Sequence, residues 1–139
     1  MGRILAIDFG TKRIGIATTD PSQLIARALV TTSQTEVWNV LDDYLAGEDV
    51  ETIVVGEPLR EDGSKSKIHH LVVGFVRKLA NRYPQVSVVL FDERYTSKEA
   101  ERIIRQSGVG QKKRREKGII DKISAALILE SYMKEKKGW

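Results

Sequence analysis

The sequence has no cysteine among its 139 residues. Disulfide bonds, thiolate metal sites and cysteine nucleophiles are therefore excluded, and the composition is compatible with a reducing compartment. No apolar run in the sequence approaches the roughly 18 residues that a membrane-spanning helix needs. The first residues lead directly into a strand-like pattern, without the apolar core of a signal peptide. We therefore expect a cytoplasmic protein that is not exported and has no membrane partner.

Two common catalytic loops are also missing. Gly10-Thr11-Lys12 lacks the full Gly-x-x-x-x-Gly-Lys-Ser/Thr spacing of a P-loop, and no Gly-x-Ser-x-Gly nucleophile elbow occurs.

The only two histidines, His69 and His70, are adjacent in a helical pattern. Because adjacent helical residues point in different directions, we expect a surface or half-buried role for them rather than a shared metal site.

Positive charge is unevenly distributed along the chain. The net charge is +4, and between residues 105 and 122 seven basic residues accompany only two acidic ones. Such a cluster attracts polyanions such as nucleic acid, although a solvated lysine-rich loop explains it equally well. The length, together with the absence of a linker or a repeat, predicts a single domain over residues 1–139.

Hydrophobic patterning gives the order of the expected elements. Three strand-like segments come first, and two further apolar strands then alternate with helical segments. Later strands need helical crossovers and run parallel, so we expect an α/β fold with a mixed five-stranded sheet and helices on both faces. Ser33 and Glu36 predict a capping box for the first helix, and Gly47 predicts its end. The predicted strands span residues 3–8, 13–19, 26–32, 52–56 and 86–91, and the predicted helices begin near residues 37, 68, 96 and 119.

Acidic residues stand at the ends of several of these elements. Asp8 follows the apolar core of the first strand, Asp92-Glu93 follow the last strand, and Asp121 falls in the first turn of the last predicted helix. Ligand sites in open α/β sheets form beyond the carboxyl ends of parallel strands. If the last helix packs across that edge, we expect Asp8, Glu93 and Asp121 to gather there.

Three gathered carboxylates repel one another, and a divalent cation removes the repulsion. Oxygen ligands alone favour Mg²⁺ or Mn²⁺, and two such ions about 4 Å apart can activate a water and stabilise the leaving oxygen in phosphodiester cleavage. Each acid also has a simpler explanation. Asp8 could form a turn, Asp121 could stabilise a helix terminus, and Asp92-Glu93-Arg94 could be a surface salt-bridge cluster.

Four segments of the chain resemble, in order, the motifs of the YqgF family of bacterial Holliday-junction-resolvase-like proteins. They are "LAIDFGTKRIGIATTD", "IVVGEPLREDGS", "FDERYTSKEAE" and "IIDKISAALILESYM". Together they cover essentially the whole chain. Four motifs in this order are specific for the family, whereas the first motif alone would not be. Members of this family are also described as candidate nucleases of pre-16S ribosomal RNA.

The resemblance implies a ribonuclease-H-like fold and a metal-dependent nuclease that acts on structured nucleic acid. It implies an acidic triad of Asp8, Glu93 and Asp121, and a role in maturing the 5′ end of small-subunit ribosomal RNA. Similarity to bacterial resolvases makes branched DNA the alternative substrate. We expect basic side chains to hold the nucleic-acid backbone at this site: Lys12, Arg13, Arg94, Lys112, Lys113, Arg114, Arg115 and Lys117.

Glu57 departs from the family pattern, which usually has an apolar or variable residue at that position. It ends the strand expected between the first and last parallel strands, and some ribonuclease-H-like nucleases take their second acid from that strand. With strands about 4.8 Å apart, Asp8 and Glu93 would be roughly 10 Å apart at the backbone. Glu57 would be nearer to Asp8, so it remains open as an extra metal ligand.

Two other functional classes fit parts of the sequence. The segment "IDFGTKRIG" also resembles the first phosphate loop of the actin, Hsp70 and sugar-kinase fold, whose ATP site lies between two such domains. The second alternative is a nucleic-acid-binding ribosome-assembly factor that kept the fold without catalysis. We expect a monomer or a weak homodimer. A resolvase that acts on a two-fold junction needs a symmetric dimer, but the sequence shows no exposed apolar stripe that would form a dimer interface.

Overall fold

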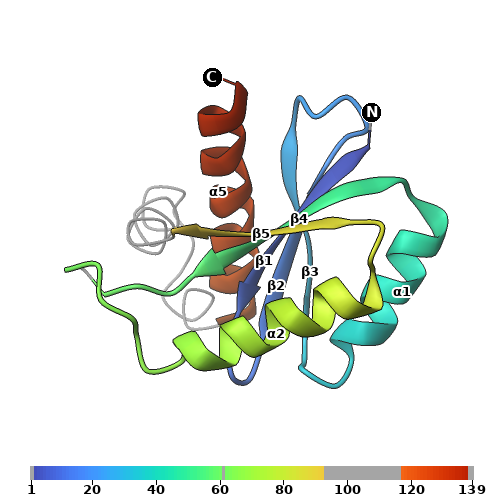
Figure 1. Cartoon of the computed structure of the whole chain (residues 1–139). Coiled ribbons are helices and arrows are strands. Elements are labelled where there is room, and N and C mark those ends of the chain that lie inside the picture. Colours follow the sequence, from blue (N-terminus) through green and yellow to red (C-terminus); the bar gives the residue numbers. More distant parts are fainter. Residues whose placement is uncertain (1, 61, 93–116, 138–139) are drawn as a thin grey trace.

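The computed structural model describes residues 2–60, 62–92 and 117–137 (Figure 1). No helix in these ranges is long and apolar enough to cross a membrane. The strands there are β1 (Arg3–Phe9), β2 (Ile14–Thr19), β3 (Ala26–Thr32), β4 (Val50–Glu57) and β5 (Ser87–Asp92), and the helices are α1 (Val37–Gly47), α2 (His69–Arg82) and α5 (Lys117–Lys137).

The five strands form one mixed sheet in the order β3-β2-β1-β4-β5. β2 pairs antiparallel with both β1 and β3, because short connections join these strands. β4 pairs parallel with β1 and with β5, and α1 and α2 provide the crossovers that parallel pairing requires. The mixed five-stranded sheet predicted from the sequence is confirmed, with β1 at its centre.

Helices cover both faces of this sheet, as predicted (Figure 1). Residues of α1 and α2, such as Leu41 and Phe75, pack with Leu5 and Ile7 of β1 in one core cluster. The other face packs against α5, whose side chains form a second cluster with Ile4, Ala6 and Val54. Successive residues of β1 therefore alternate between the two faces. This alternation decides which helix each residue at the end of the strand faces.

The helix signals of the sequence are largely confirmed. The Ser33 hydroxyl accepts a hydrogen bond from the Glu36 amide at 3.1 Å, so one of the two bonds of the predicted capping box forms. It lies in the turn before α1, because the N-cap of the helix is Glu36, which makes no side-chain cap bond. α1 ends at Gly47, as predicted. The prediction that Asp121 lies in the first turn of the last helix is wrong, because α5 begins at Lys117 and Asp121 lies in its second turn. The helix predicted near residue 96 lies outside the described residues.

α1 and α2 are joined by three side chains, Asp42, Arg82 and Tyr83, which we call the Asp42 cluster. Arg82 Nε donates to Asp42 Oδ1 at 2.9 Å, and the Tyr83 hydroxyl donates to the same oxygen at 2.6 Å. The bond from Arg82, and then that from Tyr83, lowers the pKa of Asp42 to about 2. Burial, followed by the bond to Asp42, raises the pKa of Tyr83 to about 12.

Candidate active site at the carboxyl edge of the sheet

Asp8 lies near the carboxyl end of the central strand. It pairs with Gly15 of β2, and the residue before it, Ile7, pairs with Val55 of β4. Because neighbours on both sides hold β1, the backbone at Asp8 is fixed. Ile4 and Ala6 pack against α5, so strand alternation puts half-buried Asp8 on that same face. Asp8 is thus a carboxylate on a rigid support at the edge where α/β sheets bind ligands.

α5 runs antiparallel to β1 and β4, which brings its N-terminal half to this same edge. At the other end of the helix, Lys136 Nζ lies 3.6 Å from a carboxylate oxygen of Glu51, a residue at the start of β4. The N-terminal end of α5 must therefore lie toward the carboxyl ends of the parallel strands, as Figure 1 shows. Position 121 and Asp8 share one face and one end of the sheet. The side chain of Asp121 is outside what the structure describes.

Glu57 lies on the opposite face of the sheet from Asp8. Val55 packs with α1 and α2, whereas Val54 packs with α5, so Glu57 follows Val55 onto the α2 face. His69, the first residue of α2, confirms this direction, because its Nε2 lies 2.9 Å from Glu57 Oε2. The structure therefore does not bring Glu57 together with Asp8.

The His69–Glu57 pair is the part of this edge that the sequence did not predict. His69 is only 7% exposed, so it is buried rather than on the surface or half-buried. A signal was present, since a helix that follows a parallel strand returns over the sheet and begins near the strand's carboxyl end. The pair ties α2 to β4 beside the candidate site.

The structure describes the remaining predicted site residues to different extents. Asp92, the last residue of β5, pairs with Glu57 of β4. Position 117 begins α5, but the side chain of Lys117 is not described. Among the side chains that the structure does describe, no three His, Asp or Glu groups could together hold a metal ion. The predicted site residues that lie outside the described ranges are Glu93, Arg94, Lys112, Lys113, Arg114 and Arg115.

The turn between β1 and β2 lies next to Asp8 and depends on Gly10. A Cβ atom at Gly10 would lie only 2.4 Å from the Arg13 carbonyl oxygen, so the turn has no room for a side chain there. Gln34 Nε2 donates to the Thr11 carbonyl oxygen at 2.8 Å and ties the turn to the segment before α1. Lys12 is exposed at the tip and Arg13 is half-buried. Lys12 is therefore accessible to a large ligand at this edge.

Comparisons with known proteins agree with this architecture. Residues 2–135 match the model of a family described as "RuvX: Holliday junction resolvase". A protein of Flavobacterium johnsoniae named "Putative pre-16S rRNA nuclease" is 42% identical over 137 residues, which cover 99% of each chain. A protein of Porphyromonas gingivalis with the same name is 42% identical over 133 residues, which cover 96% of each chain.

Solved structures show the same fold at low sequence identity. The Fowlpox virus resolvase in complex with Holliday junction DNA superposes with a TM-score of 0.61 at 16% identity, over 97% of this chain and 99% of that one. RuvC of Thermus thermophilus in complex with a Holliday junction gives 0.54 at 18% identity, over 99% and 97%. The ribonuclease-H-like fold implied by the motifs is thus confirmed. The chain belongs to the RuvX family, also called YqgF, whose motifs it carries along its whole length.

Proposed function

We propose that this chain is a metal-dependent nuclease that hydrolyses phosphodiester bonds in structured nucleic acid and processes the 5′ end of pre-16S ribosomal RNA in the cytoplasm. The observation that carries the proposal is the position of Asp8, at the carboxyl end of the central strand on the face covered by α5. The relatives at 42% identity, named for pre-16S rRNA, support the choice of substrate.

Asp8, Glu93 and Asp121 would form the ligand set. Carboxylate oxygens suit Mg²⁺ and Mn²⁺, and position 121 approaches Asp8 from the helix on the same face. Phe91 of β5 packs toward α5. Glu93 stands two residues after Phe91 in the sequence, which is the spacing at which strand residues share a face. Three acids from three separate parts of the chain would then converge on one side of the sheet, and Glu57, which contacts His69 on the other face, would not join them.

Each group has a separate role in the reaction. Bound Mg²⁺ or Mn²⁺ would activate the attacking water and stabilise the leaving oxygen. Asp8, Glu93 and Asp121 would hold the metal through their carboxylate oxygens. Lys12 and Arg13 at the β1–β2 turn would hold the phosphate backbone, together with Arg94 and the basic residues between 112 and 117.

A Holliday junction resolvase is the second candidate. The family description names this activity, and the two resolvases with the same fold were solved with Holliday junction DNA. A junction has two equivalent strands to cut, so this activity would require a symmetric dimer. A stable dimer in solution would therefore favour the junction, and a monomer would favour the RNA substrate.

The test is a cleavage assay with two labelled substrates, a pre-16S RNA 5′ leader and a four-way DNA junction. Each is incubated with Mg²⁺, with Mn²⁺ and with chelator, using the wild type, Asp8→Asn and the exposed control Asp43→Asn. We expect RNA cleavage that needs metal, falls more than roughly 100-fold in Asp8→Asn and is unchanged in Asp43→Asn. Cleavage of the junction alone would assign the resolvase activity. Binding of RNA without cleavage under any metal would leave the assembly-factor alternative.

A further inference from the structure

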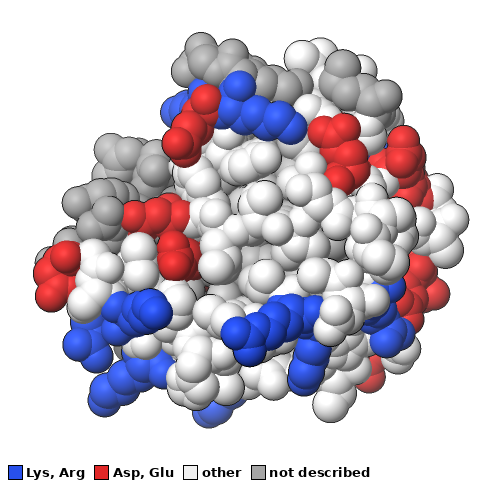
Figure 2. Space-filling view, in the orientation of Figure 1, with Lys and Arg blue, Asp and Glu red and all other residues white. Residues whose placement is uncertain are grey.

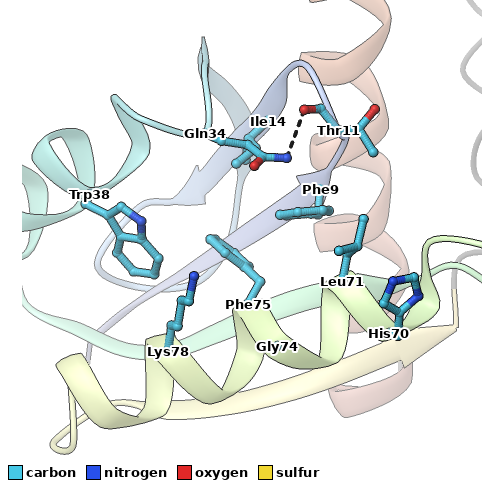
Figure 3. Close-up of a pocket in the computed structure, with 10 residues that line it drawn as sticks. All are labelled: Phe9, Thr11, Ile14, Gln34, Trp38, His70, Leu71, Gly74, Phe75 and Lys78. Atoms are coloured by element: carbon cyan, nitrogen blue, oxygen red, sulfur yellow. Dashed lines mark hydrogen bonds between the residues drawn. The ribbon is translucent and has the colours of Figure 1, made fainter.

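A cleft opens on the face of the sheet opposite to Asp8, between α1, α2 and the β1–β2 turn (Figure 3). Its volume is about 360 Å³, which is within the range of small-ligand sites. Phe9 comes from the end of β1, Trp38 from α1 and Phe75 from α2. The cleft is therefore built by three elements that are far apart in the sequence, and its shape depends on their packing.

Aromatic rings form the floor of this cleft. The ring centroids of Phe9 and Phe75 are 5.1 Å apart, and those of Trp38 and Phe75 are 5.3 Å apart. Phe75 is buried, whereas Phe9 and Trp38 are half-buried and keep part of each ring accessible. Figure 3 shows these rings side by side along the cleft. Accessible rings of this kind stack on nucleobases, and the stacking tolerates any base because every base has a π-face.

The rim of the cleft is mostly polar, and the described part of the chain places no negative charge on it. Lys78 and His70 are exposed on α2 beside the exposed apolar side chain of Leu71, and Thr11 and Gln34 complete the rim. Among the residues that the structure describes, no carboxylate lines the cleft. A second hollow, lined by Trp38, Lys78, Asn81 and Arg82, continues from it. Basic side chains gather along the lower edge of the molecular surface in Figure 2, over α2. An anionic ligand with an aromatic group matches both the floor and the rim.

The cleft begins one residue after Asp8. Asp8 faces α5, and Phe9 faces α1 and α2, because successive strand residues alternate. Both residues lie at the carboxyl edge of β1, and Thr11 of the adjoining turn lines the cleft. A nucleic-acid strand that crosses this edge would reach the cleft within a short distance of the candidate active site.

We propose that this cleft binds one unpaired base of a structured RNA next to the cleavage site, with Lys78 on an adjacent phosphate. The base stacks on the Phe9–Trp38–Phe75 floor, and the RNA duplex remains on the Asp8 side of the edge. This inference rests on the proposed nuclease function, and it specifies the substrate as RNA with an unpaired nucleotide beside a stem.

Gly74 allows the cleft to be closed without disturbing the fold. It lines the cleft from within α2, and a Cβ atom there would meet no other atom within 4 Å. Gly74→Leu therefore places a side chain in the open space of the cleft, while helix propensity rises. Gly74→Ala is the matched control, because it makes the same change in backbone entropy but fills little of the cleft. We expect both variants to melt at or above the wild-type temperature.

The binding assay uses a fluorescent RNA hairpin with one bulged nucleotide and the same hairpin with an abasic site at the bulge. All titrations contain chelator, so that no cleavage occurs. We expect the wild type and Gly74→Ala to bind the intact bulge about 5- to 150-fold more tightly than the abasic one, which is the range for stacking of one base. Gly74→Leu should bind both hairpins with the affinity of the wild type for the abasic hairpin.

A second pair of variants tests the phosphate contact. Lys78→Gln should reduce the slope of log affinity against log salt by about 0.7, the value for one phosphate of a single strand. Arg77→Gln removes one charge from the preceding residue of the same helix. Arg77 does not line the cleft, so this change should leave the slope unchanged. Equal slopes for the two variants would refute the role of Lys78.

The outcomes separate this inference from the proposed nuclease function. If Gly74→Leu keeps the preference for the intact bulge, or if the wild type has none, the cleft does not bind a base. A bulged DNA hairpin bound as tightly as RNA would refute the assignment to RNA. Loss of self-association in Gly74→Leu, without any effect on RNA binding, would identify the cleft as an interface between two copies of the chain and overturn the inference. Intact base preference without metal-dependent cleavage would refute the nuclease function alone.

Discussion

Two glycine-to-alanine substitutions should have opposite effects, because a Cβ atom meets different surroundings at the two positions. At Gly10, in the turn beside Asp8, the new Cβ atom would lie 2.4 Å from the Arg13 carbonyl oxygen. At Gly74, in the interior of α2, it would meet no atom within 4 Å. The chemical change is the same at both positions, so the difference in stability between the variants reports the local space directly.

The magnitudes follow from these distances. At Gly10 the obstacle is backbone, so the turn itself must move by roughly 0.6 Å to restore even a 3.0 Å contact. Overpacking of this kind costs about 1–3 kcal/mol, and the reduced entropy of the unfolded chain offsets about 0.4–1 kcal/mol of it. Gly10→Ala should therefore lower the free energy of unfolding by about 1–2 kcal/mol. Gly74→Ala should raise it by about 0.5–1 kcal/mol, the difference between the two residues within a helix.

Urea unfolding of both variants measures the stability, and single-turnover cleavage of the RNA leader measures the effect on the site. A displacement of about 1 Å in a catalytic group can cost 10²-fold in rate. We therefore expect Gly10→Ala to cleave at least about tenfold more slowly than the wild type, and Gly74→Ala to cleave at the wild-type rate. A Gly10→Ala variant as stable as the wild type, or a Gly74→Ala variant less stable than it, would contradict these effects of local space.

Four further predictions concern buried or paired polar groups. Gln23 is 2% exposed, and its Nε2 donates at 2.6 Å both to the Gly2 carbonyl and to Glu51 Oε1. Because Gln23→Ala takes the donor from two acceptors, it should lower the free energy of unfolding in urea titrations by about 2–4 kcal/mol. Because the pKa of Asp42 is depressed, its ionised carboxylate stabilises the fold at pH values above the ordinary pKa of 3.8, and this contribution disappears as the pH falls toward about 2. Asp42→Asn should therefore flatten the acid limb of a plot of stability against pH. An unchanged limb would contradict this. The raised pKa of Tyr83 has the opposite sign, so stability should fall as the pH rises from about 10 to about 12, and Tyr83→Phe should remove that loss. His69→Ala breaks the bond from buried His69 to the Glu57 carboxylate and should destabilise the fold by about 1–3 kcal/mol in thermal melts. The same change at the exposed His70 should cost less than about 0.5 kcal/mol.

The sheet and its central acid were predictable because they depend on local patterns. Short connections between the first three strands and helical crossovers later in the chain determine which pairs are antiparallel and which are parallel. Asp8 is recognisable as the polar residue after four buried ones, Ile4 to Ile7. The Ser33 cap was predictable for the same reason, since it needs only its own turn.

The face on which Glu57 lies was not predictable from the same patterns. β4 is apolar on both sides, so its sequence does not show which residues face α5 and which face α2. Only the packing of Val54 and Val55 against different helices settles the direction. The aromatic cleft has the same origin, because Phe9, Trp38 and Phe75 meet only after three elements pack together. Tertiary packing, rather than local propensity, determines these parts of the site.

The central claim is that catalysis takes place on the α5 face at Asp8, and a comparison of two acids tests it most directly. Single-turnover cleavage of the pre-16S RNA leader with saturating Mg²⁺ is measured for the wild type, Asp8→Asn and Glu57→Gln. We expect a loss of more than roughly 100-fold for Asp8→Asn and of less than about tenfold for Glu57→Gln, because Glu57 lies on the other face in contact with His69. Wild-type cleavage by Asp8→Asn, or an equal loss in the two variants, would contradict this claim.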